Sequence, residues 1–222
     1  MTSPYTCVLF DLDGTIVDSA PGITATLAYT FEELGVPVPS PVELLAYVGP
    51  PILDSFRDRG GFDAEKSALA LEIYRKRYLE HGVSNARMYP GVAHTLRTIH
   101  ESTLPLSLAT SKPEKPATMI LDEFDVTEYF DVITGASEDE VRSKKADVVE
   151  EALLRLATLG ADISRPVMVG DRSFDVIGAA ARNVPTIFVE WGYGPKTEAR
   201  GAIASVATTA ELDALLFPAS AS

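Results

Sequence analysis

Beyond residue 90, short apolar runs alternate along the chain with segments whose apolar residues recur every three or four positions. The recurrence in residues 148–156, for example, is typical of an amphipathic helix. Each apolar run is about as long as one strand of a sheet, and the runs cover residues 103–110, 130–134, 166–170 and 185–189. Another strand is predicted at Cys7–Phe10, where all four residues are apolar. Strands that alternate with helices predict a parallel sheet with helical crossovers.

The interval from Asp18 to Met88 has a different pattern. Helical periodicity is present in residues 23–34 and 68–78, whereas no run in the interval predicts a strand. We therefore predict an α/β protein with a Rossmann-like parallel-sheet core and an inserted α-helical cap domain. The predicted core comprises residues 1–17 and 88–222, and the predicted cap comprises residues 18–87.

Composition narrows the classes of function. A chain of 222 residues with 46% hydrophobic content can bury one full core and a smaller appended unit. It contains no run of 18 apolar residues and no recognisable leader, so we expect a cytoplasmic protein that does not enter a membrane. Cys7 is the only cysteine, which excludes an internal disulfide and a cysteine-based zinc cluster.

The formal net charge of −13 argues against binding to a nucleic-acid polymer, which needs a basic surface. Phosphate chemistry remains compatible with this charge if a divalent cation and local lysines reverse the potential at the site. The charge balance therefore favours a metal. The three histidines show no spacing typical of metal ligands.

Polar residues follow three of the predicted strands. Asp11 and Asp13 follow the first strand, and Thr110-Ser111 lies at the end of the strand predicted at residues 103–110. Asp171 follows the strand at residues 166–170, with Asp175 four positions later. Taken singly, each has a structural explanation, either as an acidic turn or as a helix N-cap. Ligands of open parallel sheets bind at the carboxyl ends of the strands, so the joint occurrence of these residues predicts a site there.

These groups suit phosphoryl transfer through a covalent aspartyl phosphate. Mg²⁺ prefers hard oxygen ligands, which Asp11 and Asp171 can supply. The Thr110 hydroxyl and nearby backbone N–H groups can hold phosphoryl oxygens. Asp13 would protonate the leaving oxygen and then deprotonate the attacking water, a role typically worth roughly 10²–10⁴-fold in rate.

With these motifs, the chain resembles the haloacid dehalogenase superfamily, and within it the phosphoglycolate phosphatase-like members with a small helical cap. The family's first motif, Asp-x-Asp-Gly-Thr, matches residues 11–15; its second matches Thr110, and its fourth, Gly-Asp-x-x-x-Asp, matches residues 170–175. The resemblance implies that Asp11 is the nucleophile and Asp13 the acid/base. It also implies a Mg²⁺ cofactor.

The same resemblance assigns the remaining residues of these motifs. Asp171 would join Asp11 as a metal ligand, and Asp13 would add its backbone carbonyl. Asp175 would be a supporting carboxylate. Leu12 and Ser111, beside the nucleophile and Thr110, are expected to contact the phosphate.

The family's third motif is a lysine before a helix, for which Lys144 and Lys145 are both candidates. We favour Lys145, because similar proteins have a small residue and then an acidic one after the functional lysine, as Ala146-Asp147 do here. Alternatively, both lysines are solvated charges at a helix start, where cations are mildly disfavoured by the helix dipole.

The Gly49-Pro50-Pro51 segment is the expected specificity loop of the cap, and Gly49 and Pro50 are its candidate substrate contacts. It is equally compatible with a simple break between two helices. The leading substrate, from the resemblance, is phosphoglycolate, and the alternative is a nucleoside 5′-monophosphate. A phosphosugar mutase or a non-catalytic phosphate-binding relative is less favoured. The expected partner is a small phosphorylated metabolite.

Overall fold

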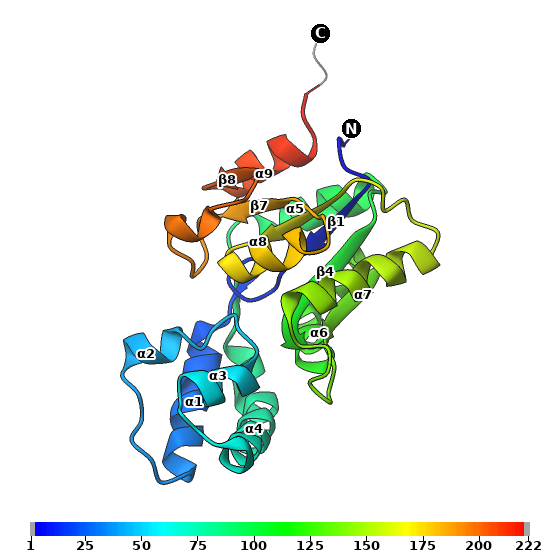
Figure 1. The fold of residues 1–222 in the computed structure, drawn as a ribbon. Coiled ribbons are helices and arrows are strands. Elements are labelled where there is room, and N and C mark those ends of the chain that lie inside the picture. The colour runs from blue at the N-terminus through cyan, green and yellow to red at the C-terminus, as the bar shows by residue number, and fades with distance from the viewer. Residues whose placement is uncertain (1–2, 220–222) are drawn as a thin grey trace.

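The computed structural model describes residues 3–219, and within them six strands form one parallel sheet (Figure 1). The strand order is β5-β4-β1-β6-β7-β8. These strands are β1 (Cys7–Phe10), β4 (Leu106–Pro113), β5 (Val132–Ala136), β6 (Pro166–Gly170), β7 (Thr186–Val189) and β8 (Ala204–Val206). The predicted parallel α/β sheet is confirmed.

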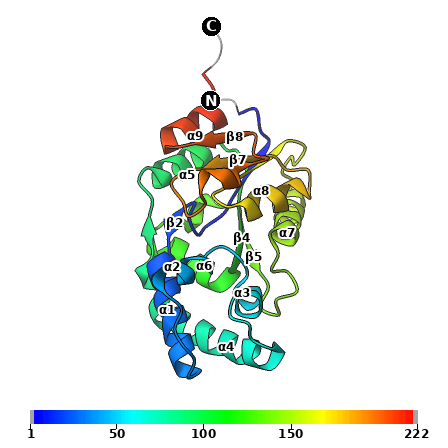
Figure 2. The ribbon, with the colours of Figure 1, turned by 60° about the vertical axis from the view of Figure 1, so that its left-hand side comes forward.

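Helices cover both faces of this sheet. Because side chains alternate along a strand, Val8 and Phe10 of β1 pack in one buried cluster, and Cys7 and Leu9 pack in another. The first cluster includes residues of α5 (Val92–Glu101), α6 (Glu114–Glu123) and α9 (Thr209–Leu216), and the second includes residues of α7 (Lys145–Thr158) and α8 (Ser173–Ala180). Figure 2 shows α5 and α9 on the opposite side of the sheet from α7 and α8. Burial on both faces explains why the strands read as continuous apolar runs.

A helical segment, here named the helical insertion, lies between β2 (Val17–Asp18) and β3 (Arg87–Met88) and below the sheet in Figure 1. It comprises α1 (Ala20–Glu33), α2 (Pro41–Leu45), α3 (Ile52–Asp58), α4 (Ala64–Arg77), a π-helical turn at Tyr78–Gly82 and a 3₁₀ turn at Val83–Asn85. β2 and β3 pair in antiparallel fashion, with Val17 opposite Met88. The chain therefore enters and leaves the insertion side by side.

Aromatic rings form the interior of the insertion. The ring of Phe31 lies 6.1 Å from that of Tyr47, 6.3 Å from that of Phe56 and 5.5 Å from that of Phe62, measured between centroids. Its first helix also lies close to the final π-helical turn, since a Cβ atom on Gly22 would be 2.1 Å from the carbonyl oxygen of Gly82. Glycine at position 22 thus allows the two ends of the insertion to pack together.

The structure also shows elements that the sequence pattern did not predict. The strand expected at residues 103–110 begins at Leu106 and continues to Pro113. β2, β3 and β8 were missed, because strands of two or three residues are too short to show a periodicity. Two further 3₁₀ turns lie at Thr127–Tyr129 and Lys196–Ala199.

The division into a core at residues 1–17 and 88–222 and a cap at residues 18–87 stays a prediction, and residues 1–2 and 220–222 lie outside the described chain. Among residues 3–219, no helix has the length and apolar character needed to cross a bilayer.

Candidate active site

Adjacent strand ends bring the predicted site residues together. β1 lies between β4 and β6 in the sheet, so Asp11, Thr110 and Asp171 come from three neighbouring strands. All three side chains are buried, as are those of Asp13 and Asp175. The carboxyl ends of parallel strands thus concentrate acidic groups at one edge of the sheet, as the sequence predicts.

Two glycines permit the loops at this edge to close around Asp171. Gly14 has a φ of +87°, and a Cβ atom there would lie 2.2 Å from Asp171 Oδ2. A Cβ atom on Gly192 would lie 2.3 Å from the same oxygen. A side chain at either position would displace the carboxylate, so glycine is required for this arrangement.

Side-chain oxygens of Asp11, Asp171 and Asp175 lie within 4.8 Å of one another. Burial, reinforced by the charges of Asp175 and Asp11, raises the pKa of Asp171 well above its ordinary value. Burial also raises the pKa of Asp175 to about 6, although Lys145 opposes this shift. Such a concentration of buried negative charge is the environment in which a cation is strongly favoured.

Lys145 supplies part of the compensating charge. Its Nζ lies 2.8 Å from Asp11 Oδ1, 2.8 Å from Asp175 Oδ1 and 2.9 Å from the carbonyl oxygen of Ala109. Burial alone would lower the pKa of this ammonium, but Asp11 and Asp175 outweigh burial and raise it. Lys144 is exposed, so the structure brings Lys145 rather than Lys144 to the carboxylates.

Hydrogen bonds from two main-chain N–H groups and one hydroxyl hold Asp171 and Asp175, the two acids of the fourth motif. The N–H of Tyr193 donates to Asp171 Oδ2 over 2.7 Å, and the hydroxyl of Thr15 donates to Asp171 Oδ1 over 3.3 Å. The N–H of Arg172 donates to Asp175 Oδ2 over 3.0 Å. Asp175 thus bridges Lys145 and the start of α8.

Asp13 has separate partners and faces a different space. Its Oδ1 accepts a hydrogen bond from the hydroxyl of Ser19, and its Oδ2 lies 3.1 Å from Lys112 Nζ. Lys112 also donates to the hydroxyl of Tyr78 over 2.9 Å. Sequence reasoning missed both Lys112 and Tyr78. The available signal was the lysine that follows Thr110-Ser111, whereas nothing near Tyr78 in the sequence indicates a contact with β4.

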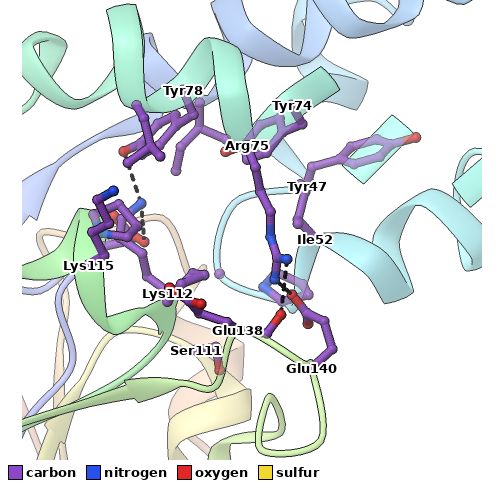
Figure 3. Close-up of a pocket in the computed structure, with 17 residues that line it drawn as sticks. Tyr47, Ile52, Tyr74, Arg75, Tyr78, Ser111, Lys112, Lys115, Glu138 and Glu140 are labelled. Atoms are coloured by element: carbon purple, nitrogen blue, oxygen red, sulfur yellow. Dashed lines mark hydrogen bonds and ion pairs between the residues drawn. The ribbon is translucent and has the colours of Figure 1, made fainter. Parts of the chain in front are cut away.

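A cavity of about 300 Å³ opens beside Asp13, between the sheet and the helical insertion (Figure 3). Ser111, a predicted phosphate contact, and Gly49 and Pro50, the predicted substrate contacts, line it. Its other lining residues are Ile23, Tyr47, Ile52, Tyr74, Arg75, Tyr78, Leu79, Lys112, Pro113, Lys115, Pro116, Glu138 and Glu140. The walls are therefore largely apolar and aromatic, with charged groups at particular points.

Arg75 reaches across this cavity from α4 to the loop after β5, as Figure 3 shows. Its guanidinium donates to the carbonyl oxygen of Glu138 over 3.0 Å and pairs with the carboxylate of Glu140. Burial raises the pKa of the Glu140 carboxyl, an effect that the Arg75 charge opposes. The insertion and the loop after β5 are thus joined by an ion pair at the cavity wall.

Two predicted phosphate-binding residues, Leu12 and Thr110, are absent from the described lining of this cavity. Leu12 is fully buried in the apolar core, and the described cavity lining does not include its side chain. The hydroxyl of Thr110, also buried, accepts a 3.3 Å hydrogen bond from the N–H of Lys112.

Comparison with known families agrees with this geometry. The model of the haloacid dehalogenase-like hydrolases matches residues 8–189, which include every acid and lysine described above. The chain belongs to this family. The resemblance recognised in the sequence is therefore confirmed.

Individual relatives have several different names. The chain is 41% identical over 188 residues to the tyrosine-protein kinase PtkA of Mycobacterium tuberculosis, covering 84% of this chain but only 62% of that protein. It is 32% identical to a 5′-nucleotidase of Pseudomonas aeruginosa, covering 88% and 87% of the two chains. Phosphoglycolate phosphatases also match, among them that of Aquifex aeolicus at 30% identity, covering 84% and 85%.

Solved structures show the same fold. One described as a predicted phosphatase from Clostridium acetobutylicum superposes with a TM-score of 0.87 at 37% identity, covering 94% of this chain and 96% of the other. The sequence-based prediction of a phosphatase-type member of the family agrees with these descriptions.

The ion pairs of Lys145 predict a specific effect on stability. Lys145→Met should lower the free energy of unfolding by about 3–5 kcal/mol, because two buried carboxylates lose their counter-charge. The loss should narrow as the pH is lowered toward about 6, the pKa to which Asp175 is raised, since protonation removes charge that Lys145 neutralises. Urea unfolding at several pH values measures both effects. Lys144→Met, at an exposed position, is the matched control; equal changes in the two variants would contradict this assignment.

Proposed function

We propose that this chain is a Mg²⁺-dependent phosphatase that hydrolyses a small phosphomonoester through an aspartyl phosphate on Asp11. One observation carries the proposal: two carboxylates from a single strand end lie in different surroundings. Asp11 is held by Lys145 next to Asp171, whereas Asp13 faces the cavity that can receive a leaving group. This separation suits one acid for attack and the other for proton transfer.

In the first step, a carboxylate oxygen of Asp11 attacks phosphorus, and the bond from phosphorus to the ester oxygen breaks. Lys145 fixes the Asp11 carboxylate and offsets charge beside it, and the hydroxyl of Thr110 is assigned to the phosphoryl oxygens. Asp13 protonates the departing oxygen. In the second step, Asp13 takes a proton from water, which attacks the phosphorus and releases phosphate and free Asp11.

The buried acidic cluster fits a magnesium ion. Its donors are carboxylate oxygens, which Mg²⁺ prefers, and burial together with the neighbouring charges of Asp175 and Asp11 raises the pKa of Asp171, surroundings in which a cation is favoured. Asp11 and Asp171 would hold the ion, with the backbone carbonyl of Asp13 as the third predicted contact. Asp175 is already bound by Lys145 and the N–H of Arg172, so it supports the site. When bound, the ion would neutralise charge on the transferring phosphoryl group.

For the substrate, phosphoglycolate is the first candidate and a nucleoside 5′-monophosphate the alternative. Relatives named for both activities support this pair. A phosphosugar mutase and a non-catalytic phosphate-binding protein remain less favoured. Assignment to the cytoplasm, with no nucleic-acid polymer or membrane as partner, is part of the same proposal.

Asp11→Asn should abolish phosphate release while leaving the fold intact, because it removes the attacking charge with little change of shape. The assay is phosphate release with Mg²⁺ from phosphoglycolate, nucleoside monophosphates, hexose phosphates and phosphotyrosine, with circular dichroism to check folding. A dominant kcat/KM for one substrate would identify it. Turnover by the variant comparable to that of the wild type would rule out the covalent route.

Asp13→Ala should slow the hydrolysis of esters with poor leaving groups much more than that of p-nitrophenyl phosphate, whose leaving group needs little protonation. The expected difference is about 10²-fold or more, the usual range for general acid–base catalysis. Comparison of kcat/KM for the two kinds of substrate measures it. Equal losses would show that Asp13 does not act as the leaving-group acid.

Magnesium should raise the midpoint of thermal unfolding, and Asp171→Asn should remove most of this shift. At a concentration 100 times its Kd, the ion would stabilise the native state by about 2.7 kcal/mol. Without magnesium, the variant should be at least as stable as the wild type, because it has lost one of several crowded negative charges. Asp162→Asn, at an exposed position, is the control. A magnesium shift that survives in Asp171→Asn would place the ion elsewhere.

A further inference from the structure

The partners of Asp13 connect it to two helices of the helical insertion, α1 and α4. Ser19, whose hydroxyl donates to Asp13 Oδ1, is the N-cap residue of α1, where the insertion begins. Lys112, which lies 3.1 Å from Asp13 Oδ2, belongs to β4 of the sheet. Its ammonium is joined in turn to Tyr78, where α4 ends. One carboxylate oxygen is therefore linked through Ser19 to the start of α1, and the other is linked through Lys112 to the end of α4.

The contact between Lys112 and Tyr78 is well defined. Lys112 Nζ lies 2.9 Å from the Tyr78 hydroxyl and 4.4 Å from the centre of its ring, and Figure 3 shows Lys112 and Tyr78 on facing sides of the cavity. Both side chains are buried, at 8% and 3% exposure. A buried ammonium needs an anionic or polar partner on each accessible side, so these contacts restrict where Lys112 can lie.

Tyr78 opens the π-helical turn at Tyr78–Gly82. A wider turn interrupts the regular ladder of hydrogen bonds, and such interruptions are frequent at functional sites. The ring of Tyr78 stacks on that of Tyr74, with centroids 5.6 Å apart and planes 10° apart. The packing of the insertion thus holds the Tyr78 ring, and the hydroxyl of that ring contacts Lys112 of the sheet.

We propose that Lys112 is a positioning residue for Asp13. It holds the Asp13 carboxylate in place for proton transfer only when the hydroxyl and ring of Tyr78, in the helical insertion, contact the Lys112 ammonium. This inference rests on the proposed function, in which Asp13 is the acid/base. Lys145 and Asp11 are joined without any residue of the insertion, so the nucleophile does not depend on this contact. Proton transfer to the leaving group is thereby coupled to the position of the insertion, whereas attack on phosphorus is not.

The test is the dependence of rate on leaving-group acidity, because a merely structural role would lower all rates alike. The substrates are p-nitrophenyl, phenyl and p-methylphenyl phosphate, which differ little in shape. Lys112→Met should lower kcat/KM for phenyl and p-methylphenyl phosphate by about 10–100-fold, a loss no greater than that expected when acid catalysis is removed completely. For p-nitrophenyl phosphate, the loss in kcat/KM should be less than about 3-fold. Tyr78→Phe, which keeps the ring, should show the same selectivity with a smaller loss.

Two controls match these substitutions. Lys76→Met removes an exposed lysine of α4, and Tyr29→Phe removes a hydroxyl from α1 outside the cavity lining. Neither should alter the selectivity. In an Asp13→Ala background, Lys112→Met should cause little further loss for poor leaving groups, because a residue that acts through Asp13 has no effect once Asp13 is absent.

Each outcome decides the matter. Equal losses over all three substrates, no loss, or full additivity with Asp13→Ala would overturn the positioning role while leaving the phosphatase intact. A wild-type protein that hydrolyses none of the substrates would instead overturn the proposed function, and the positioning role with it. If Lys112→Met does not fold by circular dichroism, Tyr78→Phe alone gives the decisive comparison.

Discussion

Crowding of buried carboxylates at the ends of two adjacent strands, β1 and β6, is the constraint that shapes this protein. A charge removed from water is costly unless it is paired and hydrogen-bonded, and here the acids repel one another as well. Lys145 offsets part of this repulsion, because its ammonium pairs with both Asp11 and Asp175. The main-chain N–H groups of Arg172 and Tyr193 provide further compensation. The close approach of the loops that carry them explains why glycine stands at positions 14 and 192.

The site thus has two parts with different mechanical support. The carboxylates of Asp11 and Asp175 pair with Lys145 of α7, and that of Asp171 accepts hydrogen bonds from Thr15 and Tyr193. Asp13 is held by Ser19 and by Lys112, which in turn contacts Tyr78. Under the proposed function, the contacts of the nucleophile therefore lie outside the insertion, whereas those of the acid/base include it.

The wall of the cavity differs in chemical character from the strand ends that carry the acids. On the side of the insertion, the lining is mainly apolar and aromatic, with rings from Tyr47, Tyr74 and Tyr78. The charge of Arg75 is paired with Glu140 across the cavity, in the loop after β5. Under the proposed function, residues of the insertion would contact the leaving group, whereas the strand ends would act on phosphorus. The relatives of this chain have different names, and a shared fold does not fix the substrate.

The sequence by itself determined the parallel sheet, because buried strands and amphipathic helices leave local periodic patterns. It also indicated that Asp11, Asp13 and Asp171 lie close together, since the carboxyl ends of neighbouring parallel strands share one edge of the sheet. The short strands β2, β3 and β8 left no such pattern. Tertiary structure alone decided that Tyr78 meets Lys112 and that Arg75 meets Glu140, pairs separated by 34 and 65 positions. Periodicity records whether a side chain faces the interior or the solvent, but not which distant side chain it meets there. That choice depends on how the insertion packs against the sheet.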